Sequence, residues 1–202
     1  MQIRIVREED AAEIADIYRP AVTDTPISFE LEPPDAAEIA HRITEVLKRT
    51  PWIVCTSDDR VLGYAYASRH RERAGYQWSV EVSAYVHRDA RRMGIARGLY
   101  NSLFAMLTYQ GFRNAYAGIT LPNKASVSLH EAVGFKLIGR YHAVGYKLGA
   151  WHDTGWFERG LAAHDVPPAL PRALPECIED PEFQIAMRAG ESCFSAPASR
   201  SE

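Results

Sequence analysis

The segment from Tyr85 to Arg97 constrains the fold more than any other part of this chain. A run typical of a β-strand ends here, a run typical of an α-helix begins, and the junction carries small residues at Gly94 and Ala96. The first N–H groups of a helix have no backbone partner and, with the helix dipole, they favour an anion. Larger side chains at these two positions would obstruct a phosphate group that approaches the backbone. The sequence therefore predicts a strand, an anion-binding loop and a helix in succession.

Two common phosphate-binding motifs do not fit this loop. A P-loop ends in Gly-Lys-Ser/Thr, which is missing here. A Rossmann fingerprint needs Gly-x-Gly-x-x-Gly early in a βαβ unit, and that pattern is absent as well. A helix start with a basic surface remains an alternative, because Arg91, Arg92 and Arg97 supply positive charge with or without a ligand.

Hydrophobic periodicity predicts a mixed α/β sheet flanked by helices, with the element order β-α-α-β-β-β-α-β-α-β-β. Helices are expected after Asp10, ending near Pro20, after Asp35 up to Leu47, and over residues 94–110 and 126–133. Strands are expected over residues 3–6, 52–55, 61–67, 78–86, 115–120, 137–147 and 154–159.

Composition changes after about residue 163, where six of the twelve prolines fall between Pro167 and Pro197. We therefore expect one domain over residues 1–163. Residues 164–202 are expected to form a Pro-rich tail, partly extended or disordered, that adds nothing to the core sheet. Residues 167–178 are expected to lie extended on the surface or on a partner subunit, and residues 195–202 to be disordered.

Composition also excludes several classes of function. A net charge of −3 and a pI near 6.2 argue against a general nucleic-acid binder. No apolar run approaches the roughly 18 residues of a membrane span, and the first residues lack the apolar core of a signal peptide, so a cytoplasmic protein is expected. Three widely spaced cysteines indicate no zinc site and no disulfide framework. Cys55, in an apolar run, is expected to be a buried thiol.

The pattern Arg91-x-x-Gly94-x-Ala96 between strand and helix resembles the pyrophosphate loop of the GNAT superfamily of acyl-CoA N-acyltransferases. A second GNAT-like element follows at residues 123–135. The chain is more similar still to the phosphinothricin and methionine sulfoximine/sulfone acetyltransferases, through residues 51–54, 78–86, 121–123, 129–132 and 145–153. This resemblance covers residues 1 to about 165. It implies a mixed, mostly antiparallel sheet flanked by helices and an acetyl-CoA-dependent N-acetyltransferase acting on such amino acids.

The resemblance also implies acetyl-CoA as the co-substrate, without a metal. Main-chain groups would pair with the pantetheine arm by a mode like strand addition, at Tyr85, Val86 and His87. The diphosphate would lie on the loop formed by Arg91, Arg92, Met93, Gly94, Ile95, Ala96 and Arg97. Asn123 and Ser126 are further candidates for cofactor binding, although Asn123 is equally plausible as a turn or N-cap residue.

Two residues are candidates for catalysis. Strand alternation turns Glu81 away from the apolar face of its strand, which by itself favours a solvated carboxylate, whereas the resemblance implies a general base for the amine. His130 lies between Val127 and Val133 on a short helix. A lone histidine at such a position is more often structural. Many GNATs carry a tyrosine at the matching place, so His130 departs from the common pattern. The resemblance to the phosphinothricin branch nevertheless implies that His130 takes part in catalysis or orients the substrate.

A basic cluster precedes the strand of Glu81. It is either a solvated loop or a site that captures a substrate carboxylate, because a guanidinium offers two parallel donors. The resemblance implies an amino-acid substrate held by Arg71, Arg73 and Tyr76, with Phe29 and Tyr66 as pocket walls, although both aromatics also suit an ordinary core.

Two alternatives to this function stay open. The acceptor could be another small amine or a peptide N-terminus, or the chain could be a non-catalytic acyl-CoA-binding module. Related enzymes are commonly dimers, so a homodimer is expected as the partner state, with no nucleic acid or membrane.

Overall fold

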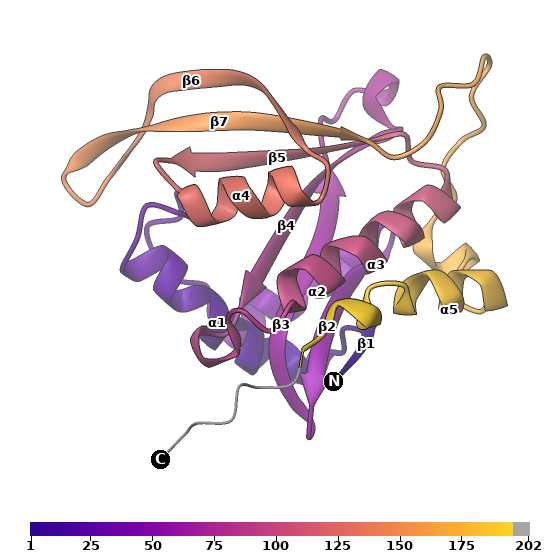
Figure 1. Ribbon diagram of the computed structural model, residues 1–202, viewed down its shortest axis with the longest axis horizontal. Helices are drawn as coiled ribbons and strands as arrows, with labels where there is room; N and C mark the ends of the chain where they lie inside the picture. The colour runs from indigo at the N-terminus through magenta and orange to yellow at the C-terminus, as the bar shows by residue number, and fades with distance from the viewer. Residues whose placement is uncertain (196–202) are drawn as a thin grey trace.

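The computed structural model describes residues 1–195, which fold around one seven-stranded sheet of order β1-β2-β3-β4-β5-β7-β6. In Figure 1, β5, β7 and β6 run across the top of the molecule, and β1 to β4 descend below them. The strands are β1 (Gln2–Ile5), β2 (Trp52–Ser57), β3 (Arg60–Arg69), β4 (Ser79–Val86), β5 (Asn114–Leu121), β6 (Lys136–Lys147) and β7 (Ala150–Gly160).

Alternation along the strands divides the core into two clusters, one on each face of the sheet. Trp52 and Val54 of β2 belong to one cluster, whereas Ile53 and Cys55 belong to the other. The first cluster is covered by α1 (Ala11–Thr23) and α2 (Ala36–Leu47), and the second by α3 (Ile95–Gln110) and α5 (Pro181–Arg188). The short helix α4 (Lys124–Ala132) follows β5 and packs against it.

The sheet is mostly antiparallel, as expected, with one parallel pair between β4 and β5. This pair is short, because only Ser79–Glu81 of β4 match Asn114–Tyr116 of β5. β4 continues for five residues beyond Glu81, and on its other side it stays paired with β3 up to Val86. Among residues 1–195, one edge of β4 therefore has no strand partner after Glu81.

The predicted order of strands and helices from β1 to β7 is confirmed. The first helix differs at both ends. It continues past Pro20 to Thr23, because a proline near the end of a helix removes only one N–H donor. The Asp10 side chain does not cap it, since both carboxylate oxygens accept hydrogen bonds of 2.7 Å from Arg4. Burial acts to raise the pKa of Asp10, but these bonds and that from Arg7 N–H lower it overall.

The chain after residue 163 contains more structure than its prolines suggest. Residues 164–173 have no regular secondary structure, but the α5 helix follows, with Pro181 in its first turn, where a proline is well tolerated. Four apolar side chains from this region join the core beside α3, namely Leu174, Cys177, Phe183 and Met187. The tail therefore contributes a helix to one face of the sheet rather than a strand. Most of the segment expected to be disordered, residues 196–202, lies outside the described residues.

Within residues 1–195, no helix combines the length and apolar character needed to cross a membrane.

Candidate active site

A narrow cleft opens where β4 and β5 part. Its volume is about 70 Å³. The walls come from β4 (residues 82–85), β5 (residues 117–120) and α4, which contributes Asn123 at its N-cap, Ser126 and His130. Ile27, from the segment between α1 and α2, also lines it. The cleft therefore brings together a free strand edge and the polar side chains at the start of α4.

Alternate residues of β4 direct their backbone groups toward β3, and the residues between them direct theirs toward this cleft. His87 N–H donates to Leu62 C=O at 2.9 Å, and Leu62 is opposite His87 in the β3–β4 register. Bonds alternate along an antiparallel ladder, so Tyr85 is also turned toward β3, and Val82, Ala84 and Val86 present their N–H and C=O groups on the open side. Of the expected set Tyr85, Val86 and His87, Val86 lies on this open side, whereas Tyr85 and His87 turn their backbone groups toward β3.

The loop between β4 and α3 has the geometry of an anion site. Arg92 and Gly94 both adopt a positive φ, of 66° and 76°, so the backbone is left-handed at two positions of this short loop. The backbone N–H groups of residues 91–97 have no hydrogen-bond partner within residues 1–195. They stand at the N-terminus of a 16-residue helix, where the dipole adds positive potential.

Glu81 is the last residue of β4 that pairs with β5, and it lies where the two strands begin to part. Its Oε1 atom accepts hydrogen bonds from His70 Nδ1 at 3.0 Å and from Arg71 at 3.1 Å. Its Oε2 atom has no partner among the described residues, and the side chain is 32% exposed. The carboxylate is therefore held in place through one oxygen while the other is open.

His70 was not identified from the sequence, although it holds Glu81 directly. Its ring stacks on Tyr116 with a centroid separation of 4.3 Å and stands edge-on to Tyr76 and Trp156. Arg71 lies over the Trp156 ring, 5.5 Å from its centroid. Alternation along β3 could have indicated His70, because Ser68 is opposite Glu81 and shares its face of the sheet.

His130 is buried and both ring nitrogens are occupied. Nδ1 donates to Ser126 C=O at 2.8 Å, so Nε2 accepts from the hydroxyl of Tyr100 at 2.9 Å. Burial lowers the pKa of His130, although its bond to Ser126 acts in the opposite direction, and burial raises the pKa of Tyr100. The pair is therefore neutral, and Tyr100, which the sequence analysis missed, lines the cleft beside His130.

The remaining predicted residues lie around this centre. Tyr66 stacks on Trp52 at 4.5 Å and lines a separate cavity of about 350 Å³ between α2 and the sheet. Phe29 is half-exposed and packs on Gly145. Tyr76 is exposed, and Arg73 has no polar side-chain contact within the described residues. Asn123 caps α4, since its side chain accepts from Ser126 N–H at 3.1 Å.

Comparison with known proteins identifies the family. A profile of the family described as "Acetyltransferase (GNAT) domain" matches residues 3–156. The chain belongs to the GNAT acetyltransferases. It is therefore an acetyl-CoA-dependent N-acetyltransferase by class, as the resemblance implied. Among residues 1–195, no cluster of His, Cys, Asp and Glu side chains is suited to hold a metal ion.

Several relatives of this GNAT protein have assigned names. The chain is 36% identical to "Phosphinothricin N-acetyltransferase" of Streptomyces viridochromogenes, over 86% of this chain and 93% of that protein. It is 31% identical to "L-methionine sulfoximine/L-methionine sulfone acetyltransferase" of Salmonella typhimurium, over 84% and 99%. A solved phosphinothricin acetyltransferase of Sinorhizobium meliloti, in complex with AcCoA, has a TM-score of 0.78 and 33% identity, over 87% and 96%.

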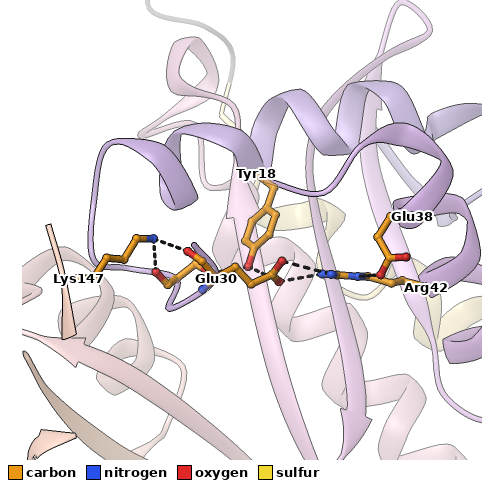
Figure 2. Close-up of polar contacts among 6 residues, drawn as sticks. Tyr18, Glu30, Glu38, Arg42 and Lys147 are labelled. Atoms are coloured by element: carbon orange, nitrogen blue, oxygen red, sulfur yellow. Dashed lines mark hydrogen bonds and ion pairs between the residues drawn. The ribbon is translucent and has the colours of Figure 1, made fainter. Parts of the chain in front are cut away.

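In this GNAT acetyltransferase, the segment between α1 and α2 is fixed to the β6–β7 hairpin. The buried ammonium of Lys147 donates to the backbone C=O of Ser28 and of Glu30, at 2.6 and 2.7 Å (Figure 2). The Glu30 carboxylate accepts from Arg42 at 2.8 Å and from the hydroxyl of Tyr18 at 3.0 Å. Burial acts to raise the pKa of Glu30, but these donors lower it overall. The contacts position Ile27, which lines the cleft, and Phe29, which packs on Gly145.

Lys147→Met should release this segment. The variant leaves two carbonyl groups without their charged donor, so we expect the free energy of unfolding to fall by about 2 kcal/mol. Amide hydrogen exchange over residues 24–35 should become faster, while exchange in α3 stays unchanged. Lys136→Met, at an exposed lysine, is the matched control. Equal exchange over residues 24–35 in wild type and Lys147→Met would contradict this role.

Proposed function

We propose that this enzyme acetylates the α-amino group of phosphinothricin, methionine sulfoximine or methionine sulfone, or of a closely similar amino acid, by direct transfer from acetyl-CoA. The observation that carries the proposal is the Glu81 carboxylate, fixed through Oε1 and open at Oε2, where β4 and β5 part. The names of the relatives support the substrate class. The tests below distinguish this function from the two alternatives, which are a different amine acceptor and a non-catalytic acyl-CoA-binding module.

The cofactor would lie along the cleft and the loop. We propose that its diphosphate accepts hydrogen bonds from the N–H groups of residues 91–97, and that the pantetheine arm pairs with the free edge of β4. An open cavity of about 620 Å³ adjoins the start of α3. Its lining has a net positive charge, because it contains one carboxylate, Glu158, and three cations, Arg97, Lys136 and Arg159. These charges suit the remaining phosphate of coenzyme A.

The chemistry requires a free amine, a polarised thioester carbonyl and a stable thiolate. An α-amino group has a pKa near 8, so most of it is protonated at pH 7. We propose that Glu81 Oε2 accepts that proton, directly or through a water molecule. A β4 N–H beyond Glu81 would polarise the carbonyl. The amine nitrogen then bonds to the acetyl carbon as the carbon–sulfur bond breaks, and coenzyme A leaves as a thiolate that takes the second proton of the nitrogen.

The role of His130 follows from its contacts. Its Nε2 atom already accepts the hydroxyl proton of Tyr100, so we propose that His130 positions the Tyr100 side chain at the wall of the cleft and is not itself a proton donor. Substrate recognition is proposed to use Arg73 and Tyr76, because Arg71 is already paired with Glu81. Tyr66 and Phe29 would bound the space for the amino-acid side chain.

The acceptor class is tested by measuring acetyl-CoA consumption with phosphinothricin, methionine sulfoximine, methionine sulfone and ordinary amino acids. We expect the three analogues to give the highest kcat/KM. Higher activity on a polyamine or a peptide N-terminus would indicate that the natural acceptor is one of those amines rather than an amino-acid analogue. Tight acetyl-CoA binding without turnover of any amine would favour the non-catalytic module.

Glu81→Gln tests the base. The amide cannot take a proton from the ammonium group, so we expect kcat at pH 7 to fall about 10²- to 10⁴-fold, with the Kd for acetyl-CoA changed less than about twofold. The remaining rate should rise with pH, because more amine is then unprotonated. Glu72→Gln, at an exposed neighbouring carboxylate, is the control. Wild-type turnover in Glu81→Gln would remove Glu81 as the base.

We also propose a homodimer formed through the β6–β7 hairpin. β6 is an edge strand, and this hairpin exposes a continuous series of large apolar side chains, which is typical of an interface. They are Leu137, Ile138, Tyr141, Val144, Tyr146, Leu148 and Trp151.

Sedimentation velocity tests this interface. The mass obtained for wild type should be twice the chain mass of 22.7 kDa. Trp151→Glu should be a monomer, because the dimer would bury a carboxylate without a partner. Ile185→Glu, at an exposed apolar residue of α5, should remain dimeric. A wild-type monomer, or a dimer that survives Trp151→Glu, would contradict the proposal.

We further propose that the enzyme acts in the cytoplasm, since its three cysteines are free thiols, which is typical of a reducing compartment. Acetylation removes the ammonium charge of an amino-acid analogue, so we propose that the activity gives resistance to such toxic analogues.

A further inference from the structure

The end of the described chain lies against the loop proposed to hold the diphosphate. Ser195 N–H donates to the carbonyl of Met93 at 3.1 Å. The carbonyl oxygen of Cys193 lies so close to Gly94 that a Cβ atom there would be 2.0 Å from it. In Figure 1 this yellow segment runs beside α3. Two parts of the chain about 100 residues apart in sequence therefore meet at the proposed cofactor site.

The contact is built on two glycines. A Cβ atom on Gly190 would lie 1.8 Å from the carbonyl oxygen of Gly98, and one on Gly98 would lie 2.7 Å from that of Gly190. Gly190 takes a φ of −90°, which any residue can adopt, so close approach rather than backbone conformation requires the glycine. Gly190 N–H also donates to Ser102 Oγ at 3.0 Å.

The segment is anchored at a second point. The Glu191 carboxylate accepts from Ile3 N–H of β1 at 2.7 Å, and Asn101 of α3 donates to Cys193 Sγ at 3.3 Å. Residues 190–195, here called the tail segment, are therefore fixed to both α3 and the sheet. They lie beyond residues 3–156, which the GNAT family profile matches.

The geometry of a peptide unit connects this contact to the cofactor. The C=O and N–H of one trans peptide point in opposite directions. The bond from Ser195 fixes the C=O of Met93, so it turns the N–H of Gly94 away from the tail segment. Glycine adopts many backbone conformations, and without this contact the Met93–Gly94 peptide could rotate. The tail segment bonds only to the carbonyl side of the loop, and its contacts leave the N–H donors open.

We propose that the tail segment is a positioning element for acetyl-CoA: by holding the Met93–Gly94 peptide, it keeps the Gly94 N–H directed at the diphosphate. This inference rests on the proposed function of the loop. It concerns affinity for the cofactor and leaves the amine site unaffected.

Ser195→Pro removes the one N–H that makes this contact, since proline has no backbone donor. Phe194 has φ −74° and ψ 133°, which is compatible with a following proline. Ser195→Ala keeps the N–H and is the matched control. In titration calorimetry, we expect Ser195→Pro to bind acetyl-CoA about fivefold more weakly, equivalent to the roughly 1 kcal/mol of one hydrogen bond. Ser195→Ala should stay within about twofold of wild type.

A second readout separates positioning from a general loss of structure. S-acetylpantetheine lacks the diphosphate, so kcat/KM with this donor should be equal in wild type and Ser195→Pro, while kcat/KM with acetyl-CoA falls. The KM for the amine should not change. If kcat/KM falls equally with both acetyl donors, or if Ser195→Pro binds acetyl-CoA like wild type, the positioning role is wrong.

A chain that ends at Ala189 provides an independent variant should Ser195→Pro fail to fold. It should bind acetyl-CoA at least fivefold more weakly, and tighter binding would show that the tail segment competes with the cofactor, which overturns the inference. Gly94→Val tests the loop itself together with the tail contact, because its Cβ atom would displace the Cys193 carbonyl and its positive φ is unfavourable for valine. Wild-type affinity in Gly94→Val refutes the proposed loop function, whereas lost affinity there with unchanged affinity in the tail variants refutes only the positioning role.

Discussion

The short parallel pairing of β4 with β5 is the constraint on which the rest of the site depends. The two strands stay together for three residues, and Glu81 is the last of them on β4. Beyond that point β4 still needs partners for its backbone groups on one edge. An extended ligand with amide groups can supply them, as an added strand would. The same strand then leads directly into the loop at Gly94, so one continuous segment spans the site from carboxylate to anion loop.

Two further contacts, both between segments distant in sequence, complete this arrangement. Lys147 connects the α1–α2 segment, which contributes Ile27 to the cleft, to the β6–β7 hairpin (Figure 2). At the opposite end, Ser195 contacts Met93 beside the anion loop. In both places a single donor fixes backbone carbonyl groups. The site is therefore preorganised by backbone contacts as much as by side chains, which reduces the ordering cost of binding.

Much of the fold could be predicted because its signals are local. Gly111 ends α3 with a φ of 101°, and the β2–β3 hairpin turns at the polar residues 57–60, as expected. The contacts His70–Glu81 and Tyr100–His130 were not predicted, because strand register and helix packing bring these residues together. α5 was not predicted because it is only eight residues long, begins at Pro181 and lies in a proline-rich stretch. The backbone phase of β4, which replaces Tyr85 and His87 by Val82 and Ala84 at the free edge, depends on its register with β3.

The central claim is that the free edge of β4 and the loop at Gly94 together position a thioester beside Glu81. A crystal structure of the enzyme with acetyl-CoA tests it most directly. We expect the diphosphate on the N–H groups of residues 91–97, the pantetheine arm along Val82, Ala84 and Val86, and the acetyl carbon on the side of Glu81 Oε2. A diphosphate bound elsewhere, or a Glu81 carboxylate turned away from the acetyl group, would contradict it.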